Sequence, residues 1–354
     1  MLYQKLVIKI GSNVLTTHQG LPDIERIEHL SNQITQLKKQ GIHVILVSSG
    51  AVASGRSMVK LPQKMNPIAE RQVLASVGQV KLMQIYAEMF GKHSLLVSQI
   101  LVTKEDFRDK THYLNMRQCF GALLQQGIVP IVNENDVVSV TELMFTDNDE
   151  LSGLVASMME VDALMILSNV DGVYDGNPNE GNAKLIPVIH KRTDFEGMIS
   201  SEKSSFGRGG MLTKCRFAQK TAALGIAVFI ANGKKENIIL DLMREKPVGT
   251  LFAPQKRKSR LKAWMAHAEG SIKGEVQINE GAEKALFSKP TSLLPVGIIK
   301  VSGNFEKGDL LKVMNVKGEA IGVGLAKYNS QTALQLIGLQ NQPELIHYDY
   351  LFLY

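Results

Sequence analysis

Short apolar, β-branched runs alternate with amphipathic stretches of helix length from the N-terminus to about residue 253. This alternation is typical of a parallel sheet that is covered by helices on both faces. Several of the runs are apolar without interruption, as expected for strands buried on both sides. The pattern therefore predicts an α/β fold with an open, mostly parallel sheet sandwiched by helices. The expected strands are residues 6–10, 43–47, 95–102, 129–132, 163–167 and 226–230, and the expected helices are residues 24–39, 68–90, 114–126, 151–159 and 211–224.

The character of the sequence changes after residue 253. Residues 254–262 are polar and basic, contain a proline and show no apolar periodicity, which is typical of a linker. From residue 273 onward, short strand-like runs are separated by frequent turn signals. The chain has 354 residues, a length that suits two domains. We therefore expect an α/β domain at residues 1–255, a linker at 256–272 and a small β-barrel-like domain at 273–354.

Composition excludes several classes of protein. No segment approaches the about 18 unbroken apolar residues of a membrane span, so we expect no membrane association. Lys9 interrupts the apolar start and no cleavage site follows, which favours a first strand over a signal peptide. The only two cysteines, Cys119 and Cys215, lie far apart without metal-type spacing, which favours a reducing cytoplasm. A net charge of +6 suits nucleic acid and suits ATP with an acidic metabolite, so charge alone leaves both open.

Two expected strand ends carry residues that suit anion binding. The first strand ends at Lys9 with Gly11 close behind, and the second runs through Ser49 into small residues that open a helix. The carboxyl edge of such a sheet is where ligands bind. A lysine there can neutralise phosphate charge, glycine lets main-chain amides approach an oxygen, and Ser49 with nearby amides could hold a carboxylate. An ordinary strand-end lysine and a close-packed turn are the alternative interpretations.

Clusters of Asn and Asp follow the expected strand at residues 129–132. Residues 133–136 (NEND) come directly after it, and residues 147–149 (DND) begin a helix. Asp and Asn at a helix start are often caps, and capping alone remains an alternative for Asp147 or Asn148. Together, the two clusters could recognise an ammonium group and fix catalytic lysines.

Two further segments could line a nucleotide. Ser168 and Asn169 follow an apolar strand, and residues 209–214 (GGMLTK) precede a helix. The second segment offers amides at a helix N-terminus and includes Lys214, a second candidate cation for phosphates. Neither the G-x-x-x-x-G-K-[ST] pattern nor a protein-kinase catalytic loop occurs. A kinase with this sequence is therefore neither a P-loop kinase nor a protein kinase.

These five segments, in this order, resemble those of the amino acid kinase family. The sequences KIGSNVLT, VSSGAVASG, IVNENDVV, TDNDELSGLVA and GRGGMLTK look like those of its glutamate 5-kinases, and EVQINEGA, SLLPVGI and VSGNFEKGDLL resemble a PUA domain. The resemblance covers essentially the whole chain. It implies the amino acid kinase fold for residues 1–255 and a PUA domain for residues 273–354.

The resemblance also implies an activity: transfer of the γ-phosphoryl group of ATP, with Mg²⁺, to the γ-carboxylate of L-glutamate, the first step of proline biosynthesis. Lys9 and Lys214 would neutralise the transferring group, and Asp149 would hold both lysines. The implied glutamate-binding residues are Ser49, Asp136 and Asn148, with Asn133, Asn135 and Asp147 as neighbours. The implied ATP contacts are Lys9, Ser168, Asn169, Gly209, Gly210, Met211, Thr213 and Lys214. Asn169 departs from the Asp of many family members, and no side chain is assigned as a metal ligand.

The resemblance further implies proline as a feedback inhibitor, a homo-oligomer (dimer or tetramer) and a glutamyl phosphate reductase that receives the labile product. None of the eight histidines is needed as a base, because a carboxylate is already ionised near neutral pH. One alternative is another amino acid kinase, acting on aspartate, N-acetylglutamate or carbamate, which the NEND segment and the PUA tail disfavour. The other is an RNA-binding PUA protein that uses the basic residues of the 256–262 stretch, for which a solvated linker is the favoured interpretation.

Overall fold

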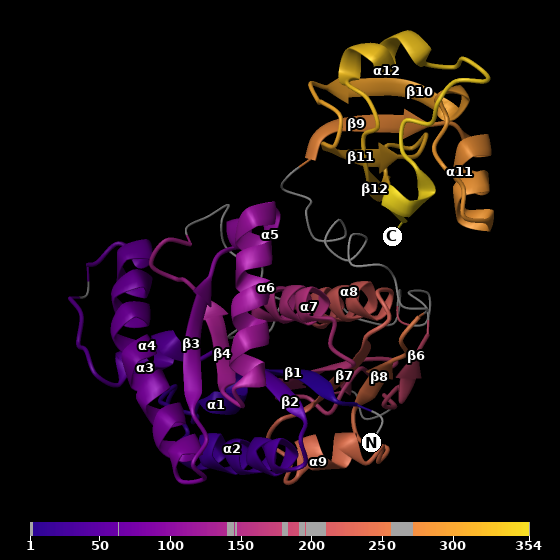
Figure 1. Ribbon diagram of the computed structural model, residues 1–354. Coiled ribbons are helices and arrows are strands. Elements are labelled where there is room, and N and C mark those ends of the chain that lie inside the picture. The colour runs from indigo at the N-terminus through magenta and orange to yellow at the C-terminus, as the bar shows by residue number, and fades with distance from the viewer. Residues whose placement is uncertain are drawn as a thin grey trace. The chain divides into compact units, whose positions relative to one another are not determined.

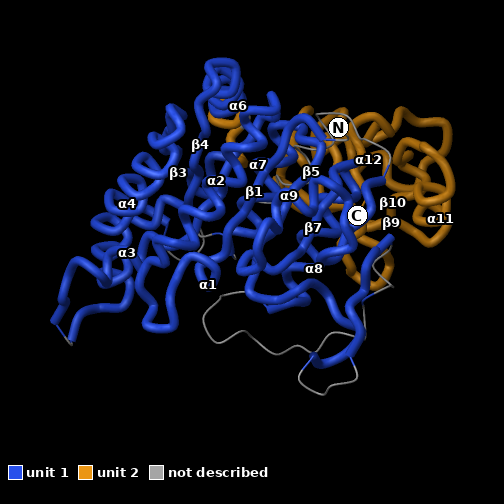
Figure 2. The backbone as a smooth tube through the Cα atoms, turned by 90° about the horizontal axis from the view of Figure 1, so that it is seen from below, with its two compact units in different colours: residues 1–106, 114–257 blue, residues 107–113, 258–354 orange. Residues whose placement is uncertain are grey.

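The computed structural model describes residues 3–62, 64–139, 145, 147–178, 183–190, 195, 210–255 and 272–353. Gly209 and residues 256–271 of the predicted linker lie outside these ranges. The chain forms two compact units, Met1–Asp106 with Leu114–Arg257 and Phe107–Tyr113 with Lys258–Tyr354 (Figure 2). Across the described ranges, no helix is long and apolar enough to cross a membrane.

The first unit is built on an eight-stranded sheet with the order β3-β4-β2-β1-β5-β7-β8-β6 (Figure 1). The neighbouring strands run parallel except for β7 and β8, which are antiparallel. All six expected strands are present, which confirms the predicted mostly parallel sheet. The short strands β6 and β8 escaped prediction because two or three residues carry no recognisable periodicity. The strands are β1 Lys5–Ile10, β2 His43–Ser48, β3 Val97–Val102, β4 Val129–Glu134, β5 Ala163–Ser168, β6 Val188–Ile189, β7 Ala227–Asn232 and β8 Thr250–Phe252.

Helices cover both faces of this sheet (Figure 1). On β1, Leu6, Ile8 and Ile10 join a core with residues of α2, α4 and α9. Because successive residues of a strand point to opposite faces, Val7 and Lys9 point to the other layer, where α7 and α8 pack on β1, β5 and β7. The helices are α1 Ser12–Leu15, α2 Ile24–Lys39, α3 Ala51–Arg56, α4 Pro67–Gly91, α5 Lys104–Arg108, α6 Lys110–Gln125, α7 Asn148–Met159, α8 Met211–Ala222 and α9 Ile238–Met243.

Helices α3 and α4 touch through their backbones at two glycines. A Cβ atom at Gly78 would lie 1.8 Å from the carbonyl oxygen of Ala51, and one at Gly55 would lie 2.0 Å from that of Leu74. Heavy atoms cannot approach so closely, so both positions exclude any larger residue. The contact holds α3, which follows Ser49, against the long helix α4.

The second unit contains a five-stranded sheet with the order β10-β9-β11-β12-β13. Strands β9 and β11 are parallel, and the other pairs are antiparallel. Its core includes Val276, Val313 and Phe305, and a Cβ at Gly274 would lie 2.6 Å from the Phe305 ring. The strand-rich C-terminal region predicted from residue 273 onward is therefore present, and its described residues also form two α-helices and two short 3₁₀-helices, η5 and η6. The elements are β9 Ile272–Ile278, α11 Glu280–Ser288, η5 Pro295–Gly297, β10 Ile298–Gly303, β11 Leu310–Met314, β12 Ala320–Leu325, α12 Ser330–Leu336, η6 Tyr348–Tyr350 and β13 Leu351–Leu353.

Candidate active site

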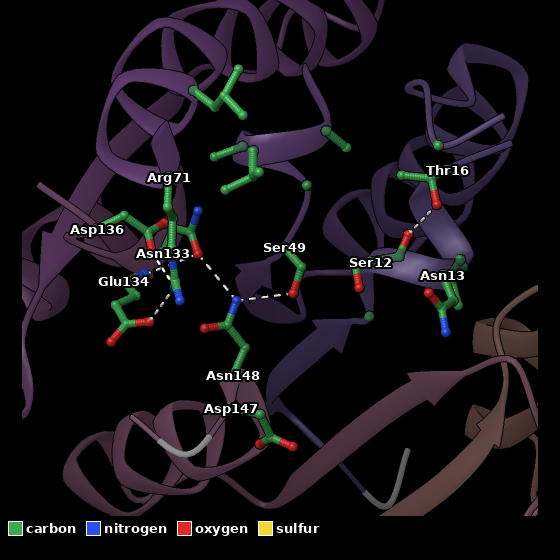
Figure 3. Close-up of a pocket in the computed structure, with 18 of the residues that line it drawn as sticks. Ser12, Asn13, Thr16, Ser49, Arg71, Asn133, Glu134, Asp136, Asp147 and Asn148 are labelled. Atoms are coloured by element: carbon green, nitrogen blue, oxygen red, sulfur yellow. Dashed lines mark hydrogen bonds and ion pairs between the residues drawn. The ribbon is translucent and has the colours of Figure 1, made fainter. Parts of the chain in front are cut away.

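A cavity of about 650 Å³ opens at the carboxyl ends of β1, β2, β4 and β5, which are consecutive in the sheet (Figure 3). The polar residues that follow these strands converge on it. Helices α1, α3 and α7 also start at this edge, so main-chain N–H groups without helical partners lie close to the cavity. The predicted residues that line it are Lys9, Ser49, Asn133, Asp136, Asp147, Asn148, Ser168, Asn169 and Lys214.

Asp149 lies behind the cavity wall and joins two lysines. The Nζ atom of Lys9 is 2.6 Å from Oδ1 of Asp149, and Nζ of Lys214 donates a hydrogen bond to Oδ2. The Asp149 side chain is 0% exposed, and those of Lys9 and Lys214 are 6% and 16% exposed. One negative charge therefore faces two positive charges, so these three side chains together carry a net positive charge.

The protonation states follow from this arrangement. Burial by itself would raise the pKa of Asp149, but the charges of Lys9 and Lys214 outweigh it and hold the pKa far below its usual range. Burial would lower the pKa of Lys214, but the charges of Asp149 and Asp147 raise it above its usual value. Both groups of the Lys214–Asp149 pair are therefore charged at neutral pH.

The local sequence explains why these three side chains meet. Lys9 lies between Val47 of β2 and Ile166 of β5 in the sheet register, so its strand neighbours offer no charged partner. Its place in the alternation points it to the face that α7 covers, and Asp149 is the second residue of α7. The ion pair is thus a consequence of strand alternation and of where α7 begins.

Asp147 fixes that starting point. Its Oδ1 atom accepts hydrogen bonds from the main-chain N–H groups of Asp149 (2.7 Å) and Glu150 (3.3 Å), so it is the N-cap of α7. Burial, together with the charge of Asp149, raises the pKa of Asp147 to about 6. The capping interpretation therefore holds for Asp147, which also lines the cavity, and Asn148 is the first helical residue.

Asn148 links the ends of two strands, β2 and β4. Its Nδ2 donates to Ser49 Oγ (2.9 Å), to Asn133 Oδ1 (3.1 Å) and to the carbonyl oxygen of Ser48 (3.3 Å). Figure 3 shows the amide nitrogen turned toward Ser49 and Asn133 and the amide oxygen turned away from them. Three residues that the sequence suggested separately thus form one hydrogen-bonded group.

Arg71 and Glu134 line the cavity, but the sequence did not identify them as site residues. Arg71, on α4, donates from Nε to Asp136 Oδ1 (2.9 Å) and from Nη2 to Glu134 Oε2 (3.3 Å). The other Glu134 oxygen accepts the Phe145 N–H (2.9 Å), and burial raises the pKa of Glu134. The sequence predicted only that the NEND cluster could recognise an ammonium group or fix the catalytic lysines, and nothing in the sequence of α4 singled out Arg71.

The predicted nucleotide-binding residues are only partly gathered at the cavity. Ser168 and Asn169 line it at the end of β5, and Lys214 reaches it from α8. Gly210 caps α8, and Met211 and Thr213 lie in its first turn without lining the cavity. Asn135 also stays outside the lining. Polar residues that follow β1 also line the cavity although no role was predicted for them, namely Ser12, Asn13 and Thr16.

The acidic groups do not form a metal cage. Among the described residues, no group of three or more His, Cys, Asp or Glu side chains could hold a metal ion. The carboxylate of Asp149 is engaged by two lysines, which leaves Asp147 as the cavity-lining carboxylate that interacts with both of them. This donor set fits a magnesium ion that is bound mainly by the phosphate groups of a nucleotide.

Comparison with known proteins agrees with the geometry. Residues 4–232 match the amino acid kinase family and residues 274–341 match the PUA domain. "Glutamate 5-kinase" of Bacteroides thetaiotaomicron is 47% identical over 355 residues, covering 99% of each chain. "Glutamate 5-kinase" of Chlorobaculum tepidum is 49% identical over 354 residues, covering 99% of this chain and 98% of that protein. The chain therefore belongs to the amino acid kinase family and carries a PUA domain after its kinase domain.

Proposed function

We propose that this protein transfers the γ-phosphoryl group of ATP to the γ-carboxylate of L-glutamate and so forms L-glutamyl 5-phosphate. The observation that carries the proposal is the buried Lys9–Asp149–Lys214 cluster beside a cavity lined by amides and carboxylates. The family match and the printed names of the full-length relatives support the same reaction.

The chemistry needs positive charge more than it needs a base. The γ-carboxylate of glutamate is ionised near neutral pH, so it attacks the γ-phosphorus without losing a proton. A carboxylate oxygen bonds to phosphorus while the bond to the β,γ-bridging oxygen breaks, and ADP leaves with that electron pair. Lys9 and Lys214 neutralise charge on the phosphoryl oxygens, and Asp149 fixes their positions.

Magnesium, bound to the nucleotide phosphates with Asp147 nearby, would supply further charge neutralisation. Ser49 and the main-chain amides at the start of α3 are suited to bind a substrate carboxylate. Asp136 and the oxygen of Asn148 are suited to accept hydrogen bonds from an ammonium group. Both kinds of group occur in L-glutamate.

The same proposal includes the wider context of the reaction. Proline acts as a feedback inhibitor at the glutamate pocket, and the protein works as a dimer or tetramer. The acyl phosphate product is labile in water, so a reductase must consume it promptly. The two cysteines, both free, suit a cytoplasmic enzyme.

The experiment that tests the proposal is ADP release with MgATP in the presence of hydroxylamine, which traps an acyl phosphate as a hydroxamate. Glutamate, aspartate, N-acetylglutamate and buffer alone are compared. We expect hydroxamate with glutamate only, and at least about a hundredfold loss of kcat in Lys214→Met. The control Lys92→Met removes an exposed lysine that pairs with Glu28 on the surface, and we expect wild-type activity from it.

Turnover of another acid in place of glutamate would keep the kinase and reject the substrate. No turnover with any of them, together with steeply salt-dependent RNA binding, would support the RNA-binding alternative instead. Millimolar proline, added to the same assay, should inhibit competitively with glutamate.

A further inference from the structure

Gln79 of α4 lies behind the cavity without lining it. Its side chain is buried, and its Oε1 atom accepts a hydrogen bond from Asn133 Nδ2 at 3.1 Å. Its own Nε2 atom meets no acceptor among the described residues. A buried amide that uses only its oxygen suggests that the acceptor is what this position requires.

One main-chain group fixes the orientation of each side-chain amide that links Gln79 to the cavity, namely those of Asn133 and Asn148. The N–H of Glu134 can only donate, and it donates to Asn133 Oδ1 (2.9 Å), so Asn133 must turn Nδ2 toward Gln79. The carbonyl of Ser48 can only accept, and it receives Asn148 Nδ2 (3.3 Å). Asn148 must therefore keep its nitrogen toward the strand ends.

The consequence reaches the cavity. With Nδ2 of Asn148 engaged by Ser48, Ser49 and Asn133, its Oδ1 atom is turned away from them, as Figure 3 shows. Asn148 lines the cavity, so this oxygen is an acceptor that the protein offers to a ligand. An ammonium group has three donors and no acceptor, and it is the part of an amino acid that such an oxygen binds.

Removing the Gln79 acceptor would disturb this arrangement. Asn133 is buried, so its Nδ2 would be left without a partner, which is unfavourable. Rotation of the Asn133 amide would turn that nitrogen away from residue 79 but would place it against two donors, the N–H of Glu134 and Asn148 Nδ2. Asn148 would then lose one of the contacts that keep its oxygen toward the ligand.

We propose that Gln79 is a positioning residue for recognition of the substrate's α-ammonium group, acting through Asn133 and Asn148. The inference rests on the proposed function, because it takes L-glutamate as the ligand. Gln79 touches neither the cavity nor the reacting atoms, so its effect is on substrate preference.

The test compares Gln79→Met, which removes the acceptor but keeps the bulk, with Gln79→Glu, which keeps an acceptor oxygen. Gln84→Met on the exposed side of α4, where Gln84 donates a hydrogen bond to Glu88, is the control. Three quantities are measured: kcat/KM for L-glutamate, the inhibition constant of glutarate, which lacks the amino group, and KM for ATP.

We expect Gln79→Met to lower kcat/KM for glutamate by about tenfold or more. The inhibition constant of glutarate and KM for ATP should change less than about twofold. Gln79→Glu and Gln84→Met should resemble the wild type. An equal loss for glutamate, glutarate and ATP would indicate a structural role only and would overturn the proposal, as would unchanged kinetics in Gln79→Met.

Failure of the two proposals can be told apart. If the wild type forms no hydroxamate from glutamate, the proposed function fails whatever Gln79 does. If the wild type is active and the preference for glutamate survives in Gln79→Met, only the role of Gln79 fails. Should Gln79→Met not fold, a selective loss of glutamate turnover in Gln79→Glu, which keeps the acceptor, overturns the role.

Discussion

Replacing Asp149 with asparagine removes the charge that holds Lys9 and Lys214 but keeps the shape of the side chain. The carboxylate is 0% exposed, so water cannot compensate for its loss. Removing one partner of a buried ion pair costs about 3–5 kcal/mol, and here two buried cations lose their partner together. For a unit of this size, each kcal/mol lowers Tm by about 2–4 °C, so Asp149→Asn should melt about 6–20 °C below the wild type.

The pH dependence of this difference has a definite sign. The pKa of Asp149 in the folded protein lies below its unfolded value, so its stabilisation is present above about pH 4 and is lost as the pH falls toward the folded pKa. The gap in Tm between wild type and Asp149→Asn should therefore be full at pH 7 and shrink below about pH 4. Thermal melting followed by circular dichroism at several pH values measures it.

The same variant should lose at least about a hundredfold in kcat in the hydroxamate assay, because the two lysines no longer have fixed positions. Asp241→Asn is the matched control: Asp241, with a side chain 19% exposed, pairs with Lys246, whose side chain is 52% exposed to solvent. It should cost less than about 1 kcal/mol and leave activity intact. A Tm for Asp149→Asn within about 2 °C of wild type, with activity within about tenfold, would refute the reasoning.

Three further predictions concern pH, packing and thiol chemistry. Burial, together with the charge of Asp149, raises the pKa of Asp147 to about 6 in the folded protein. Its contribution to stability therefore falls as the pH rises from about 4 to about 6. Asp147→Asn keeps a capping side chain, so its Tm should rise relative to that of the wild type as the pH rises over this range. A difference in Tm that does not change with pH would contradict this. Gly78→Ala should lower the free energy of unfolding by about 2–3 kcal/mol because its Cβ would lie 1.8 Å from a carbonyl oxygen of α3. Gly91→Ala in the same helix, where a Cβ meets nothing within 4 Å, should change it by less than about 1 kcal/mol in the same urea titration, and equal effects would argue against the contact. Burial raises the pKa of Cys215 to about 12 whereas Cys119 is exposed, so a chromogenic disulfide should react rapidly with one thiol, and Cys119→Ser should abolish that phase.

Much of the site could be predicted because polar residues at the end of a strand can be recognised from the local sequence alone. A parallel strand that ends in polar residues places them at the carboxyl edge of the sheet, whichever strands are its neighbours. Lys9, Ser49 and Asn133 were found in this way, and the cavity contains all three. Lys214 was found from the glycine-rich start of its helix, although Met211 and Thr213 from the same segment do not line the cavity.

Arg71 and Gln79 could not be found in this way. Both lie in α4, a helix of 25 residues whose polar positions look alike in sequence. Their roles depend on side chains of other elements. Arg71 contacts Glu134 and Asp136, and Gln79 contacts Asn133. The approach of α3 to α4 at Gly55 and Gly78 is likewise a matter of packing, because Gly91 and Gly121, which are also helical, have no such contact.

The amino-acid sequence by itself determined the class of fold, the strand ends that carry polar groups and the two lysines that are candidate cations for a phosphoryl group. These features depend on hydrophobic periodicity and on short segments, which are local properties of the chain. The resemblance to a known family implied that Asp149 holds Lys9 and Lys214, and the structure shows both contacts. Only the tertiary structure decided that Arg71 holds Glu134 and Asp136, and that Asn133 donates a hydrogen bond to the buried amide of Gln79. Those contacts join residues far apart in the chain, and they exist only because the order of the strands and the packing of α4 and α7 bring them within hydrogen-bonding distance.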